Sequence, residues 1–250
     1  MSNFKDHFSG HADIYCEARP TYPPQLFAWL AQQATDRQLA WDCGCGNGQA
    51  TVALADHFTR VVGSDPSANQ IAAAERRANI EYRVEPAEHS SLAGASAGLV
   101  TVAQALHWFD HAAFYAEVKR VLKPTGLFAA WAYSDCTTGD PDIDRIKDKL
   151  YADLTGPYWP PERAHVDAGY KTLPFPFVEI AAPHFDMVAH WTVEHLLAYF
   201  RSWSATQRYI KVKGDDPVAI IEPQLRAAWG DPNAVRDVRW HFHLRCGRSS

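Results

Sequence analysis

The chain has 250 residues, of which 47% are hydrophobic and 21% charged, and its formal net charge is -5. This ordinary balance excludes a disordered or fibrous protein, and the length suits one large domain or one domain with an insertion. The acidic balance, without any run of Lys and Arg, offers no basic surface for DNA or RNA. We therefore expect no nucleic-acid partner.

Targeting and metal signals are also missing from the sequence. The first residues, MSNFKDHFSGHADIY, lack a charged segment followed by an apolar one, and no apolar run approaches the length of a membrane span. The single close pair of cysteines, Cys43 and Cys45, has poor spacing for zinc. We expect a cytoplasmic, reduced protein with no metal site and no membrane partner.

The first predicted helix is RPTYPPQLFAWLAQQA, with its prolines at the N-terminal end, where a helix tolerates them. Residues 36–135 then alternate between apolar strands and helices. The predicted strands are LAWDC, RVVGSD, IEYRV, GLVTVAQ and GLFAAWAY, and the predicted helices are QATVALADHF, SANQIAAAERRA and HAAFYAEVKRVL. This alternation predicts βαβ units and a parallel sheet that is covered on both faces.

Beyond Ser134 the pattern is less regular. PDIDRIKDKLYADL predicts a helix, TGPYWPPERAHVDAGYKTLPFPF a loop, and VEIAAPHFDMVAHW a strand. Two or three helices follow between Thr192 and Trp229, and the alternation in VRDVRWHFHLRCG predicts a last strand. We expect one domain, with closing strands in 176–191 and 235–246 and a cap formed by 136–175 and 192–232.

The stretch WDCGCGNGQAT follows the first predicted strand and contains Gly44, Gly46 and Gly48. Glycines at this point let the backbone turn sharply and approach a ligand, and the N–H groups of the following helix favour polar or negative groups. In the dinucleotide pattern G-x-G-x-x-G the third glycine would fall at Gln49 or Thr51, so that pattern fails. A nicotinamide-dependent oxidoreductase is therefore the weaker alternative.

Ligands of an open parallel sheet bind at the carboxyl ends of its strands, so the loops after the predicted strands should meet at one edge. An acid about twenty residues beyond the glycines can accept both hydroxyls of a ribose, and Asp65 has this position. Asp65 could equally cap the next helix, and the two roles are compatible. The polar residues and glycines expected at this edge are Asp42 to Gly48, Asp65, Ala87, Glu88 and Gln104 to Trp108.

The motif D-x-G-x-G-x-G from Asp42 to Gly48 resembles the first motif of class I S-adenosylmethionine-dependent methyltransferases. Further segments with this resemblance are YCEARPTYP, VVGSDPS, PAEHSSL, VTVAQALHWFD and LKPTGLFAAWAYS. Within the class, the chain is similar to the type 11 group that includes trans-aconitate methyltransferases. The resemblance implies a doubly wound, mostly parallel, seven-stranded Rossmann-like α/β sheet with helical cap insertions. It also implies a lid segment at 8–35 and a cofactor-binding core at 36–135.

The resemblance implies S-adenosylmethionine as cofactor, with S-adenosylhomocysteine as product, and a role for each loop. The glycine loop with Cys45 would lie under the methionine portion, and Asp42 would receive its amino group directly or through water. Asp65 would bind the ribose. The other implied cofactor contacts are Pro66 and Ser67 beside the adenine, Ala87 and Glu88 at its edge, and Gln104 and Ala105 beside the sulfonium. Pro86 and Gly98 stand where many relatives carry acids.

Methyl transfer is an in-line displacement, in which alignment and exclusion of water matter more than any one residue type. An acidic oxygen needs no base, whereas an amine or alcohol often does. His107 is the candidate catalytic residue, as a base or as a hydrogen-bonding partner of the acceptor; a histidine satisfied inside its loop is the alternative. Further candidates are Arg19 and Tyr15 for the cofactor, and Trp108, Tyr22, Trp131 and Tyr133 for the acceptor, with Trp159, Trp203 and Arg201 in the cap.

The sequence thus predicts a methyltransferase that acts on a small-molecule acceptor, with O-methylation of a carboxylate or hydroxyl by analogy with the trans-aconitate enzymes. The alternative is a non-catalytic protein that binds S-adenosylmethionine and acts through partners. We expect a monomer or homodimer.

Overall fold

The computed structural model describes residues 19–249. Tyr15 and the first part of the predicted lid segment lie outside the described residues. Eight strands form one sheet in the order β3-β2-β1-β4-β5-β8-β6, with β7 paired to β8. The strands are β1 (Leu39–Cys43), β2 (Arg60–Asp65), β3 (Ile80–Val84), β4 (Ala97–Ala103), β5 (Leu122–Thr137), β6 (Val178–Glu179), β7 (Met187–Trp191) and β8 (Arg236–Arg248).

The strands β1 to β5 are parallel, and β8 runs antiparallel to β5, β6 and β7. The order reverses at β1, which lies between β2 and β4, so the loops after β1 and β4 face each other at the carboxyl edge of the sheet. The helices are α2 (Pro24–Gln33), α3 (Gln49–Ala55), α4 (Ala68–Ala72), α5 (His111–Val121), α6 (Pro141–Asp148), α7 (Arg163–Asp167), α8 (Val193–Arg201), α9 (Ser204–Lys213) and α10 (Pro217–Trp229). Shorter turns are η1 (Leu106–Trp108), η2 (Lys149–Leu154) and η3 (Gly156–Tyr158).

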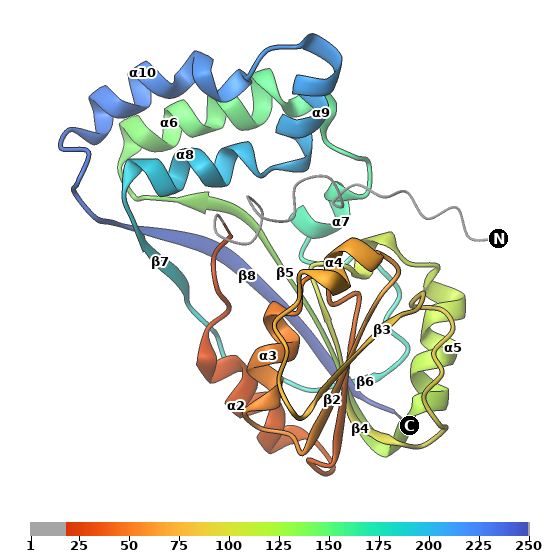
Figure 1. Ribbon diagram of the computed structural model, residues 1–250. Coiled ribbons are helices and arrows are strands. Elements are labelled where there is room, and N and C mark those ends of the chain that lie inside the picture. Colours follow the sequence, from red (N-terminus) through yellow and green to blue (C-terminus); the bar gives the residue numbers. More distant parts are fainter. Residues whose placement is uncertain (1–18, 250) are drawn as a thin grey trace.

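Both faces of the sheet are covered, as the continuous apolar strands predict. Leu26 and Leu30 of α2 and Leu54 of α3 are fully buried against one face. Phe114 and Val118 of α5 are fully buried against the other. Figure 1 shows α2 and α3 on one side of the strands and α5 on the other. No helix in the described part of the chain is long and apolar enough to cross a bilayer.

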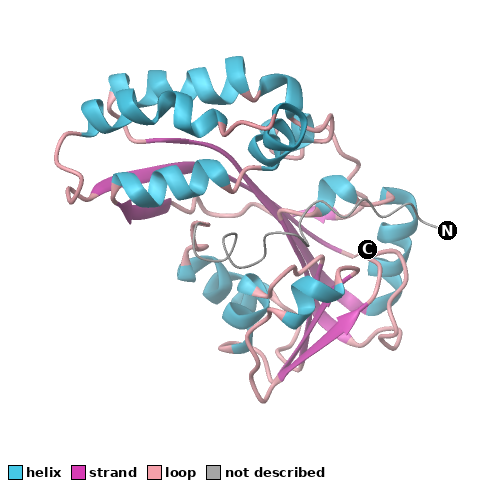
Figure 2. Ribbon diagram, turned by 45° about the horizontal axis from the view of Figure 1, so that its top comes forward, coloured by secondary structure: helices cyan, strands magenta, loops and turns pink. Residues whose placement is uncertain are grey.

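A second group of helices lies beyond the sheet, and we call α6, η2, α8, α9 and α10 the helical cluster. It has its own hydrophobic core, which includes the fully buried Leu197, Phe200 and Ile221. Figure 1 shows the long strands β5 and β8 extending from the sheet to this cluster, and Figure 2 shows the same separation from a second angle.

Side-chain caps fix where helices of both groups begin. Asp110 accepts hydrogen bonds from the backbone N–H groups two and three residues ahead, at the start of α5. Asp140 does the same for α6, and Asp216 accepts one such bond at the start of α10. A proline follows directly in the last two cases, at the helical position where its missing N–H is harmless.

The structure differs from the sequence expectations in four places. The sheet has eight strands because the predicted strand 178–191 is broken around Pro183, which cannot donate to a ladder, and leaves β6 and β7. The helix predicted after Ser67 ends at Ala72, where Arg76 donates to the Ile71 carbonyl. The predicted loop 155–177 contains η3 and α7. The predicted helix 141–154 is divided into α6 and η2.

Candidate functional site

The glycine loop joins β1 to α3 in a conformation that favours glycine. Gly44, Gly46 and Gly48 have φ of +67°, +55° and +87°. A Cβ at Gly44 would come within 2.7 Å of the Cβ of Ala105, and one at Gly48 within 2.2 Å of the Tyr82 hydroxyl. At Gly46 the nearest described atom would be 3.7 Å away. The first and third glycines therefore permit close packing, whereas a Cβ at the second would make only an ordinary van der Waals contact with Gln70.

Asp42 lies at the end of β1, under this loop, and is fully buried. Its two carboxylate oxygens accept hydrogen bonds from the hydroxyls of Thr51, at 2.6 Å, and Thr101, at 2.8 Å. Burial raises the pKa of Asp42 to about 6, although both hydroxyls act in the opposite direction. Asp42 thus ties β1 to α3 and β4, and its predicted contact with a ligand's amino group stays a prediction.

Asp65 ends β2 and also faces the glycine loop. Its Oδ2 accepts the backbone N–H of Gly46 at 2.9 Å, and its Oδ1 accepts that of Ser67 at 2.8 Å. Ser67, rather than Asp65, caps α4. Since a carboxylate oxygen can accept more than one hydrogen bond, the two backbone donors orient Asp65 and leave it able to accept further hydroxyls.

The loops after β3 and β4 complete the carboxyl edge. Ala87 is buried, and Glu88 accepts the backbone N–H of Asp110 at 3.0 Å, which links the third loop to the start of α5. Gln104 has φ of +56°, unusual for a residue other than glycine. Its side-chain amide donates to the Tyr133 carbonyl at 2.9 Å and so fixes the fourth loop against β5. Such strained residues concentrate at functional sites.

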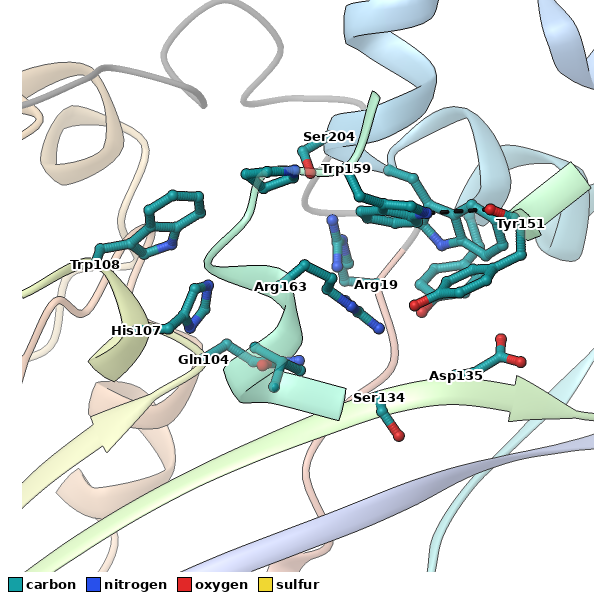
Figure 3. Close-up of a pocket in the computed structure, with 14 residues that line it drawn as sticks. Arg19, Gln104, His107, Trp108, Ser134, Asp135, Tyr151, Trp159, Arg163 and Ser204 are labelled. Carbon is teal, nitrogen blue, oxygen red and sulfur yellow. Dashed lines mark hydrogen bonds between the residues drawn. The ribbon is translucent and has the colours of Figure 1, made fainter. Parts of the chain in front are cut away.

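A cavity lies between the carboxyl edge and the helical cluster (Figure 3). Its empty volume is about 610 Å³, including its open mouth. The lining residues come from six separate parts of the chain: Arg19, Gln104, His107, Trp108, Ser134, Asp135, Tyr151, Trp159, Pro160, Arg163, Val166, Tyr199, Trp203 and Ser204. The structure therefore brings six of the predicted residues to one cavity: Arg19, Gln104, His107, Trp108 and, from the cap, Trp159 and Trp203.

His107 in this cavity is held by Tyr170. Its Nδ1 lies 3.1 Å from the Tyr170 hydroxyl, within hydrogen-bonding distance. A hydroxyl that donates to Nδ1 leaves the imidazole proton on Nε2, and we expect this tautomer for His107. Burial, together with the charge of Arg163, lowers the pKa of His107 to about 3. His107 is accordingly a neutral hydrogen-bond donor over the whole physiological range.

The burial and the backbone conformation of Tyr170 indicate that its contact with His107 is a functional one. Its side chain is fully buried, and its φ of +60° lies in the left-handed region, which is unfavourable for a bulky residue. This backbone conformation places the hydroxyl under η1. There the hydroxyl contacts Nδ1 of His107.

Arg19 bridges the sheet and the helical cluster. Its guanidinium donates to the Tyr133 hydroxyl at 3.2 Å and to the Ser202 carbonyl at 3.1 Å, and lies 5.7 Å from the ring centre of Tyr199. The sequence analysis predicts Arg19 as a clamp for the methionine carboxylate of the cofactor, and its position at the cavity keeps that prediction open.

Other predicted acceptor residues lie outside the cavity lining. Trp131 is fully buried on the face of the sheet covered by α2, where its ring centre lies 5.6 Å from that of Tyr22. Tyr133, two residues further along β5, faces the same side and also packs against Tyr22. Arg201 is paired with two carboxylates near α10. Trp131 and Tyr133 lie on the same face of the sheet because side chains two residues apart along a strand point to the same side.

Several lining residues escaped the sequence analysis, above all Tyr151, Arg163 and Asp135. Tyr151 lies in η2, and Arg163 begins α7 in a segment that reads as a proline-rich loop. The stretch WPPER, with an aromatic residue four positions before an arginine, is the one signal that could have pointed to Arg163. The contact itself depends on the fold.

Comparison with known proteins identifies the family. Residues 41–130 match the model described as a methyltransferase domain. A Dictyostelium discoideum protein, named provisionally as a methyltransferase, is 35% identical over 250 residues, covering 97% of this chain and 95% of that protein. A solved structure from Anaeromyxobacter dehalogenans, described provisionally as a type II methyltransferase, shares 45% identity with a TM-score of 0.86, covering 92% of this chain and 97% of that one.

The chain therefore belongs to the S-adenosylmethionine-dependent methyltransferases. Its mixed α/β sheet with a parallel centre is the Rossmann-like fold of that class, as the sequence predicts. The narrower resemblance to trans-aconitate methyltransferases stays a prediction.

Proposed function

We propose that this methyltransferase transfers the methyl group to an oxygen of a small-molecule acceptor, a carboxylate in preference to a hydroxyl. The observation that supports the proposal is the state of His107, a partly buried, neutral imidazole that lines the cavity. The cavity is small and enclosed by side chains from both halves of the chain, which suits a metabolite better than a polymer.

The carboxyl edge fits the cofactor. The bare backbone of the glycine loop suits the methionine portion, and the oriented carboxylate of Asp65 suits two ribose hydroxyls. Pro66, Ala87 and Glu88 are proposed neighbours of the adenine, and Gln104 and Ala105 of the sulfonium. When bound, S-adenosylmethionine supplies a methyl group on a positively charged sulfur, which an anionic oxygen can take without any proton transfer.

The acceptor side supports a carboxylate because its described residues offer donors rather than a base. The His107 pKa of about 3 makes its imidazole a weak proton acceptor. The lining carboxylate Asp135 is in contact with Lys147, which holds it as an ion pair. An alcohol would need one of these groups to accept its proton, whereas a carboxylate needs only alignment and exclusion of water.

The helical cluster is the proposed cap. It brings Trp203 and Tyr199 to the cavity, and η2 contributes Tyr151. Residues 8–35 as a lid, a cytoplasmic location, and a monomer or homodimer remain our expectations.

The experiment starts with calorimetric titration of S-adenosylhomocysteine, with NAD as the control ligand. We expect micromolar binding of the first and none of the second. Formation of S-adenosylhomocysteine from S-adenosylmethionine is then followed with matched small acids, alcohols and amines. Turnover with acids supports the proposal; turnover with amines alone contradicts it. Tight cofactor binding without turnover on any of them would favour the alternative, a non-catalytic binding protein.

A further inference from the structure

Arg163 is a charged residue that lines the cavity, and none of the proposed cofactor contacts involves it. It begins α7 and reaches between Gln104 on one side and Tyr151 on the other (Figure 3). Its side chain is 19% exposed, so most of the guanidinium lies away from bulk water. Keeping a positive charge away from bulk water costs free energy unless a contact or a ligand compensates for the lost hydration.

Three neighbours hold the guanidinium in one orientation. Its centre lies 4.8 Å from the ring centre of Trp159 and 5.8 Å from that of Tyr151, both within cation–π range. Its Nε donates to Asp167 at 3.0 Å, one turn further along α7. The orientation is therefore fixed before any ligand arrives, which reduces the entropy lost on binding.

Within the described residues, some N–H donors of the Arg163 guanidinium have no acceptor. A guanidinium has five N–H donors. Asp167 accepts the Nε proton, and the Tyr151 hydroxyl itself donates to Asp167. The donors that remain are at the terminal nitrogens, and the side chain lines the cavity. A planar edge with two parallel donors matches a carboxylate.

The other charges around the cavity agree with a negative ligand group. Arg19 contributes a second positive charge. Asp135 is compensated by Lys147, which also contacts Asp148. Asp167 is engaged by Arg163 and by the Tyr151 hydroxyl. The donors of Arg163 that have no acceptor among the described residues thus favour an anion.

We propose that Arg163 is an acceptor-binding residue that anchors a carboxylate of a small organic acid, and that the methyl group goes to a different oxygen of the same molecule. This inference rests on the proposed function. The anchored carboxylate is a poor methyl acceptor because the guanidinium engages its oxygen lone pairs. The acceptor consequently carries an anionic group in addition to the oxygen that is methylated, and the product keeps a negative charge.

Three probes of one shape test the anchor: glutarate, monomethyl glutarate and dimethyl glutarate. Each is titrated calorimetrically into protein saturated with S-adenosylhomocysteine. The first two retain a carboxylate and should bind at least about 10-fold more tightly than the neutral diester, as expected when a charge-assisted bond is available. Equal affinity for all three, or binding of none, would overturn the proposal.

Variants assign the effect to the residue. Arg163→Gln should weaken binding of both acids about 10- to 100-fold and leave the diester unchanged. Arg163→Lys keeps the charge without the fork and should be intermediate. Arg145→Gln, on the exposed face of α6, is the matched control and should change nothing. Unchanged affinity for S-adenosylhomocysteine and an unchanged melting temperature show that the Arg163 variants are folded; acids bound as tightly by Arg163→Gln as by the wild type would refute the anchor.

The same samples separate this inference from the proposed function. With S-adenosylmethionine in place of its product, methyl transfer is measured for each probe. Transfer that is equally efficient in Arg163→Gln would remove the anchor and leave O-methylation standing. Binding of the acids that depends on Arg163, without methyl transfer to any acid, would leave the anchor standing and remove O-methylation.

Discussion

The carboxyl edge and the cavity are built in different ways, although they adjoin. The edge is made of short loops that each follow a strand, and its key contacts involve backbone, such as the Gly46 N–H on Asp65. The cavity is made of side chains from segments as distant as Arg19 and Ser204. The first kind of site leaves a local pattern in the sequence, and the second does not. The difference suggests that the cofactor region tolerates little change, whereas the acceptor region can vary with the substrate.

The largest expected effect is at the glycine loop. Gly46→Val places a branched side chain on the loop that is proposed to contact the cofactor, in an unfavourable backbone conformation, so we expect no detectable binding of S-adenosylhomocysteine by calorimetry. Gly139→Val is the matched control, because Gly139 has φ of +74° and a Cβ there would meet no described atom within 4 Å. Both variants should lose about 1–2 kcal/mol of stability, but only the first should lose binding. Normal binding by Gly46→Val would refute our account of the loop.

The buried carboxyl group of Asp42 predicts how the stability of the protein depends on pH. Its pKa is raised from 3.8 to about 6, so the folded state holds the proton more tightly than the unfolded state. Stability is therefore greatest below pH 4 as far as this group is concerned, and about 3 kcal/mol is lost as the pH rises through 6. Chemical unfolding of wild type and Asp42→Asn between pH 4 and 7 should show a difference that changes by roughly this amount. Parallel curves would contradict the assignment.

Asp65 tests the ribose contact at the same edge. Asp65→Ala removes the acceptor for two backbone N–H groups and for the proposed ribose hydroxyls, and should weaken S-adenosylhomocysteine binding about 50-fold, from the usual strength of charge-assisted bonds. The fold should survive, as judged by circular dichroism. Asp56→Ala, on the exposed end of α3, serves as the control. A folded Asp65→Ala with unchanged affinity would remove Asp65 from the site.

The next prediction concerns Tyr170, whose hydroxyl contacts His107 in the cavity. Tyr170→Phe deletes the hydroxyl that fixes the imidazole, so His107 can exchange between its two neutral forms. We expect methyl transfer to fall about 10-fold, on the scale of a lost hydrogen bond, while S-adenosylhomocysteine affinity stays the same. Nitrogen NMR should report Nε2–H in the wild type and a mixture in the variant. A wild-type imidazole protonated at Nδ1 would overturn the proposed donor role.

The smallest effect is expected at His107 itself. His107→Gln keeps a donor at the end of the side chain, and methyl transfer should fall only a few-fold, on the order of what a partly preserved hydrogen bond allows. Because the pKa of His107 is lowered to about 3, the wild-type rate should not titrate with this residue between pH 5 and 8. A rate that rises with an apparent pKa near 6.5 and disappears in His107→Gln would show that His107 is a base.

The same difference between local loops and distant side chains explains which features of the fold and the site the sequence predicts. The βαβ core, the glycine loop and the position of Asp65 follow from strand periodicity and from spacing, which are local properties, and the cofactor class was implied by the resemblance of these segments to the methyltransferase motifs. Trp131, predicted at the acceptor, lies under α2, and Tyr133 packs against Tyr22 and the core of the helical cluster, since strand parity decides the face and the sequence does not say which face is which. The Tyr170–His107 contact joins residues 63 positions apart, and Arg163 acquires its surroundings only when α7 packs beside η2. Contacts of this kind depend on the completed fold.

The most direct test of the central claim uses S-adenosylmethionine labelled in its methyl group, incubated with the protein and with glutarate as acceptor. We predict that the label enters the acceptor as an ester, which mild base releases as methanol. A product with a base-stable label, or no labelled product from protein that binds S-adenosylhomocysteine tightly, would contradict the account.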